Sequence, residues 1–122
     1  SRNQVTIAKD GGIQRILKSM NEHESSAAVQ EKGCGALWSL ALNDDNKVAI
    51  AKDGGIQRIL KSMNEHASIL AVQENGCWAL LSTCWTTASH WTIARDHGAK
   101  PLLQKLTIEK AKKCLEKLEK YT

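Results

Sequence analysis

Cysteine has the widest chemical repertoire of the residue types in this 122-residue sequence, but its four copies are not spaced for metal binding. Cys34, Cys77, Cys84 and Cys114 form no Cys-x-x-Cys pair, and no cysteine–histidine spacing matches a zinc site. Cys34, Cys77 and Cys84 lie on or beside an apolar helical stripe, and a buried thiol behaves as a small apolar side chain. We therefore predict core thiols, no metal and no disulfide scaffold, which fits a reducing compartment such as the cytoplasm or nucleus.

The four histidines are placed for structural roles. His23 and His66 end two identical segments, where an imidazole can meet the free carbonyls of a helix end. We favour this capping role over a ligand role. His90 and His97 have no evident carboxylate or cysteine partner, so the pattern gives a metal site little support.

Motifs that position a nucleophile, a phosphate or a catalytic metal are absent from the sequence. It has no Gly-x-Ser-x-Gly, no phosphate-binding Gly loop ending in Lys-Ser/Thr, and no His-Glu-x-x-His. Ser82, His90 and Asp96 are the residue types of a hydrolytic triad, but residue types without geometry do not make one. We predict that the protein is not an enzyme and needs neither a catalytic residue nor a cofactor.

Positive charge is concentrated at the C-terminal end. Residues 100–122 hold seven Lys and three Glu, which accounts for the whole net charge of +4. A body without a basic face argues against nucleic-acid binding. The tail itself could contact acidic partners, RNA or lipid headgroups, although its Glu–Lys alternation favours a solvated helix face. No stretch approaches the roughly 20 apolar residues of a membrane span.

An internal repeat of 43 residues organises the chain. Residues 3–45 align without gaps on residues 46–88, with 29 of 43 positions identical, and residues 91–98 open a third copy in phase. We expect one domain over residues 1–122, with repeat one at 3–45, repeat two at 46–88, and a truncated third repeat with a C-terminal cap at 89–122. The sequence opens on Ser1 rather than Met, so we also expect it to be an excised piece of a longer protein.

Each repeat is expected to contain three helices, of which the first is short. In repeat two this helix spans about residues 47–52, and Asp45 or Asn46 can cap its free backbone N–H groups. The pair Gly54-Gly55 ends it, because glycine enters left-handed conformations without a Cβ penalty.

The second helix of the repeat carries one apolar stripe at i, i+3, i+4 and i+7. The stripe consists of Ile56, Ile59, Leu60 and Met63. The residues expected to face away from the core are Gln57, Arg58, Lys61 and Ser62.

The third helix is expected to follow a cap at Ser25 or Ser26 in repeat one. Its stripe consists of Val29, Gly33, Ala36, Leu37 and Leu40. Gly33 and Gly76 occupy the same position inside this helix, where glycine costs about 1 kcal/mol relative to alanine. Recurrence of that glycine predicts a close helix–helix contact that leaves no room for a side chain.

The repeat resembles the armadillo repeat over nearly the whole chain. The resemblance rests on the short first helix, the Gly-Gly turn, the Ile-x-x-Ile-Leu second helix and the Val-Gln-Glu-x-Gly-Cys-x-Ala-Leu third helix. It implies an all-α fold, specifically an armadillo-type right-handed α-solenoid with three helices per 43-residue repeat. The third copy lacks eight residues before its last helix, which suits a terminal repeat with a polar outer face.

The resemblance also implies a binding groove. In armadillo proteins the third helices line a concave groove, and in nuclear-import receptors of this family a Trp and an Asn one turn apart bind an extended peptide. Trp78 stands at that Trp position but Ser82 replaces the Asn, so import-cargo binding is in doubt. The residues expected to line the groove are Glu31, Gly35, Ser39, Glu74, Trp78 and Ser82. Trp78 serves either as a binding platform or only as packing, and the sequence leaves both open.

The other tryptophans differ from their counterparts in the neighbouring repeat. Trp85 and Trp91 replace apolar residues at the junction of repeats two and three, and we expect them to fill the core there. Trp38 lies one residue from the apolar stripe and is expected to be half exposed.

Two functions follow from these patterns. We expect a non-enzymatic scaffold that binds a protein or an extended peptide, because solenoids present extended concave surfaces. The alternative is a structural or oligomerisation segment. No cap precedes repeat one, so its face over residues 3–23 is expected to meet either a missing upstream repeat or a second copy of the chain.

Overall fold

The structure, a computed structural model, describes residues 11–122 and is all-helical over that range, as the sequence predicts. The first two helices are α2 (Gly12–Glu22) and α3 (Ala27–Leu40). The next three are α4 (Asp44–Lys52), α5 (Gly55–Glu65) and α6 (Leu70–Cys84). The last three are α7 (Ala88–Asp96), α8 (Ala99–Gln104) and α9 (Glu109–Tyr121).

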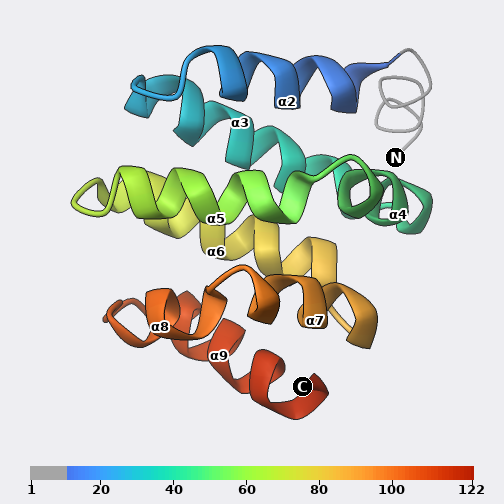
Figure 1. The fold of residues 1–122 in the computed structure, drawn as a ribbon, viewed down its shortest axis with the longest axis vertical. Helices are drawn as coiled ribbons and strands as arrows, with labels where there is room; N and C mark the ends of the chain where they lie inside the picture. Colours follow the sequence, from blue (N-terminus) through green and yellow to red (C-terminus); the bar gives the residue numbers. More distant parts are fainter. Residues whose placement is uncertain (1–10) are drawn as a thin grey trace.

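The helices form two layers, and within each layer successive helices follow one another along the long axis of the molecule (Figure 1). In one layer α5 packs against both α2 and α8, and in the other α6 packs against both α3 and α9. Each helix of the first layer also packs on the helix that follows it in the second, as α2 on α3, α5 on α6 and α8 on α9. The predicted three-helix unit is therefore present as α4–α5–α6 and as α7–α8–α9. In repeat one α2 and α3 are the second and third helices, and the predicted first helix lies outside the described residues.

Among residues 11–122, polar side chains cap the first turns of α3 and α4. The Ser26 hydroxyl accepts a hydrogen bond from the Val29 backbone N–H at 3.2 Å, which confirms the predicted cap of α3. The predicted cap of α4 is wrong, because Asn43 accepts from the Asn46 backbone N–H at 3.1 Å and the helix begins at Asp44. Asn46 is instead buried inside the helix, and its amide donates to the Leu40 carbonyl at 2.9 Å.

The Gly-Gly turn between α4 and α5 uses its two glycines for different reasons. Gly54 has φ of 85°, a left-handed conformation that disfavours side chains. Gly55 begins α5, and a Cβ built there would lie 2.8 Å from the Ile50 carbonyl oxygen. The first glycine therefore provides the turn and the second lets α4 approach α5.

The core confirms the predicted stripe of the second helix and corrects its polar face. The stripe of α5 is buried between the layers together with apolar residues of α6. It consists of Ile56, Ile59, Leu60 and Met63. Arg58 and Ser62 were expected to face away, but only 4% of Arg58 and none of Ser62 is exposed. Both residues lie at the junction with repeat one, which covers a second face of α5. The periodicity of a single helix predicts the face that packs within its own repeat but does not reveal this second packed face.

The last repeat is shortened where the sequence indicates. Helix α8 spans only Ala99–Gln104, with Pro101 in its first turn, where the missing N–H has no helical partner to lose. Helix α9 buries Ala111, Cys114 and Leu118 and exposes most of its charged residues. No helix among residues 11–122 has the length and apolar character needed to cross a bilayer.

Candidate binding face

The predicted groove residues lie on α3 and α6, which pack side by side. Trp78 of α6 is half-buried, and its ring stacks on that of Trp38 of α3 with 5.1 Å between ring centroids and 29° between planes. Offset aromatic pairs at this separation are favourable. Trp38 is partly buried, as expected, but the sequence did not pair it with Trp78, because the two residues hold different positions within their repeats.

A cation from the third repeat completes this arrangement. The Lys110 ammonium of α9 lies 3.8 Å from the centroid of the Trp78 ring, well within the range of a cation–π interaction. Trp38, Trp78 and Lys110 thus form a row across α3, α6 and α9, which we call the aromatic row. Sequence reasoning missed Lys110, since the Glu–Lys pattern of this segment indicates only a solvated helix face.

The remaining predicted residues border the aromatic row. Ser39 and Glu74 are exposed, whereas Glu31, Gly35 and Ser82 are intermediate. Within residues 11–122 the side chains of Glu74 and Ser82 make no hydrogen bond or ion pair with another residue, so both can meet a ligand.

Asn75 joins α6 to α3 beneath this border. Its amide donates to the Glu31 carbonyl at 3.0 Å, and a Cβ built on Gly35 would lie 3.6 Å from the same amide nitrogen. Sequence reasoning missed Asn75, because repeat one carries Lys32 at the equivalent position.

The two tryptophans expected to fill the core at the third repeat behave differently. Trp91 is fully buried, as predicted, and its indole N–H donates to the Trp85 carbonyl at 2.7 Å. The prediction for Trp85 is wrong, because it is 43% exposed. Trp85 directly follows the last residue of α6 and has φ of 29°. The Lys117 ammonium lies over its ring, 4.2 Å from the ring centroid.

Three histidines meet carbonyl oxygens, which can only accept, so the ring nitrogens donate. His66 bonds the Glu24 carbonyl at 2.7 Å, which belongs to the preceding repeat rather than to its own helix end. His90 bonds the Thr83 carbonyl at 2.9 Å and His97 the Ile93 carbonyl at 2.8 Å. His23, expected to act like His66, is exposed.

The helix ends that the histidines were expected to cap are instead held by two equivalent glutamines. The Gln30 amide donates to the carbonyls of Met20 and His23, at 3.0 and 2.9 Å. Gln73 donates to the matching carbonyls of Met63 and His66, at 2.9 and 2.8 Å. The Gln of the Val-Gln-Glu motif therefore joins the third helix of each repeat to the end of its second helix.

All four cysteines are buried free thiols, as predicted. Burial raises the pKa of Cys34 to about 12 and that of Cys84 still further, because a thiolate loses its hydration there. The pKa of Cys114 is also raised. The main cause is a hydrogen bond with the Cys77 side chain, and the second cause is burial. Among residues 11–122 no cluster of three or more His, Cys, Asp or Glu could hold a metal ion.

Comparison of the chain with protein-family models, with curated proteins and with solved structures gave no match.

Proposed function

We propose that this chain is an armadillo-type binding scaffold without enzymatic activity, and that the face formed by α3, α6 and α9 binds an extended peptide or protein segment. The aromatic row is the observation that carries the proposal. It places two tryptophans and a lysine from three successive repeats on one surface, as repeat scaffolds do at their binding surfaces.

The chemistry of the row suits a peptide ligand. Tryptophan combines a large apolar face with a donor N–H, and it is enriched at the residues that contribute most to protein binding. Glu74 and Ser82 lie on the same helix as Trp78, four residues to either side, and have no partner within residues 11–122. They can supply acceptors and a hydroxyl to a peptide backbone laid across the helices.

The test begins with peptides selected from a random displayed library against the intact chain. Trp78→Ala should weaken binding of the selected peptides by about 30-fold or more, the loss of a residue worth at least about 2 kcal/mol at an interface. Trp78→Phe should recover part of the affinity because it keeps an aromatic face.

Trp85→Ala is the matched control. Trp85 is also partly exposed and also lies under a lysine, but it is at the end of α6 outside the aromatic row. If peptides bind Trp78→Ala as tightly as the original chain, or lose affinity with Trp85→Ala instead, then Trp78 only packs between helices and the proposed face is wrong.

A further inference from the structure

The outer face of repeat one carries the same residues that repeat two buries. Arg58, Ile59, Ser62, Val72 and Ala79 are buried at the junction with repeat one. Their counterparts 43 positions earlier are identical in type but exposed or half-buried. These counterparts are Arg15, Ile16, Ser19, Val29 and Ala36, and we call their surface the α2–α3 face.

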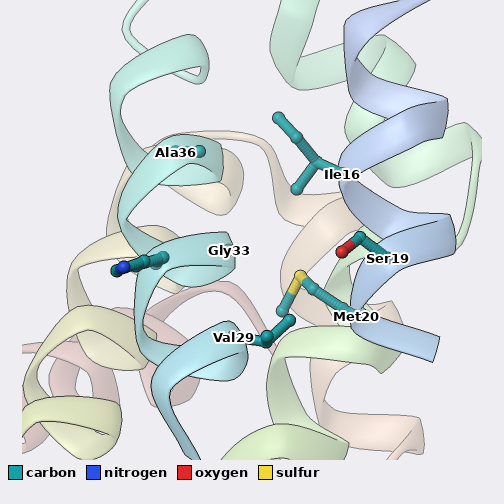
Figure 2. A pocket seen from close by; sticks show the side chains of 7 residues that line it. Ile16, Ser19, Met20, Val29, Gly33 and Ala36 are labelled. Atoms are coloured by element: carbon teal, nitrogen blue, oxygen red, sulfur yellow. The ribbon is translucent and has the colours of Figure 1, made fainter. Parts of the chain in front are cut away.

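The α2–α3 face is hollowed (Figure 2). A pocket of about 260 Å³ lies between the two helices, with Ile16, Ser19 and Met20 on the α2 side and Val29, Gly33 and Ala36 on the α3 side. Lys32 of α3 also lines the pocket, and five of the seven lining residues are apolar or glycine. An exposed apolar hollow with a polar border is typical of a surface that binds another protein element.

The junction between repeats one and two shows what covers this face. Arg58 donates to the Asn21 side-chain oxygen at 2.9 Å and to the Glu24 carboxylate at 3.0 Å. The Ser62 hydroxyl donates to the Gln30 side-chain oxygen at 2.5 Å. The covering surface is therefore the C-terminal side of a repeat, with an Asn in the last turn of its second helix, a Glu just after that helix and a Gln in its third helix.

We infer that the α2–α3 face is a docking surface for a preceding helical repeat of the same kind, which presents an Asn and a Glu to Arg15 and a Gln to Ser19. By the 43-residue register, the positions that would supply these groups lie before Ser1, so no residue of this sequence occupies them. This surface lies apart from the aromatic row, and the inference does not depend on peptide binding.

A second copy of this chain is a poor occupant of the face. Its own Asn21, Glu24 and Gln30 are already engaged with its second repeat. Its other end is α9, where five Lys outnumber three Glu. That end would meet Arg15 and Lys32, which carry charge of the same sign.

The experiment adds one further copy of residues 3–45 directly before residue 3 of the chain, which preserves the 43-residue register. If the copy docks, the extended chain should unfold in urea in one transition with a higher midpoint than the original. Arg15→Ala should leave the original midpoint unchanged but lower that of the extended chain. Separate transitions, or an Arg15→Ala change without effect in the extended chain, would overturn the inference.

Sedimentation equilibrium of the original chain tests the competing occupant. A monomer across the concentration range supports the inference. A dimer that Ile16→Asp disrupts would overturn it, since the face would then belong to a second copy.

Discussion

At the residue scale, three glycines on the third helices have different physical roles. A Cβ built on Gly76 would lie 2.5 Å from Met63 Cγ, and one on Gly33 would lie 2.5 Å from Met20 Cγ. Gly35, by contrast, has only an ordinary contact at 3.6 Å with Asn75. The close helix–helix contact predicted from the recurring glycine is thus confirmed. The methionine of the second helix fills the space that the missing side chain leaves.

Substituting each glycine with alanine should separate these roles. Gly76→Ala should lower the free energy of unfolding by about 1–2 kcal/mol, since overpacking outweighs the gain in helix propensity. Gly33→Ala should lower it less, because Met20 borders the pocket on the α2–α3 face and has room to shift. Gly35→Ala is the control and should be neutral or stabilising by up to about 1 kcal/mol. Urea unfolding measures all three, and a fully stable Gly76→Ala protein would contradict the close contact.

At the element scale, an ion-pair cluster joins α5 to the loop between α2 and α3. The Glu24 carboxylate accepts from Lys61 at 2.8 Å and from Arg58 at 3.0 Å, and Arg58 also approaches Glu65 at 3.4 Å. The hydrogen bond from Lys61, and then that from Arg58, lowers the pKa of Glu24 below its ordinary value of 4.5. Arg58 is buried, so the cluster fixes how repeat two is placed on repeat one.

This lowered pKa gives the junction a defined pH dependence. A carboxyl whose pKa falls on folding contributes stability above its ordinary value of 4.5, and this contribution is lost as the pH falls through the lowered pKa. Glu24→Gln should therefore be less stable than the original chain at neutral pH, and the difference should shrink as the pH falls below 4.5. Urea midpoints measured across this range check it. The stability difference between Glu24→Gln and the original chain should also shrink in a Lys61→Met background. A difference that depends on neither the pH nor Lys61 would count against the cluster.

At the scale of the whole molecule, the packed layers protect every thiol in the chain. Cys34, Cys77, Cys84 and Cys114 are each fully buried, and they come from α3, α6 and α9. Because these helices pack in sequence along the molecule, opening any one thiol to solvent requires separating two repeats or two layers.

Thiol labelling should therefore report global unfolding. At pH 8 the native chain should react with Ellman's reagent only as fast as it opens, and all four thiols should react in urea. Since burial raises the pKa of Cys34 from 9.0 to about 12, its contribution to stability is complete below pH 9.0 and falls as the pH rises toward 12. A thiol that reacts in the native chain at the rate of a free cysteine would contradict this packing.

The sequence by itself determined those features of this protein that depend on residues close together along the chain. The 43-residue period, the Ser26 cap, the left-handed turn at Gly54 and the buried stripe of α5 all follow from local spacing and backbone preference. The residues predicted to line a groove could likewise be assigned to α3 and α6 from their register. Whether they bind anything remains a prediction.

Only the tertiary structure decided which side chains from different repeats meet. Arg58 looks like a solvent-facing residue within its helix, yet it is buried because repeat one covers it. Trp38 and Trp78 stack because α3 and α6 lie side by side, and Lys110 reaches the same ring from α9. Such contacts join residues that are 32 to 40 positions apart, where helical periodicity carries no information. Identical residues in repeats one and two also differ in burial, because their surroundings rather than their identity set their exposure.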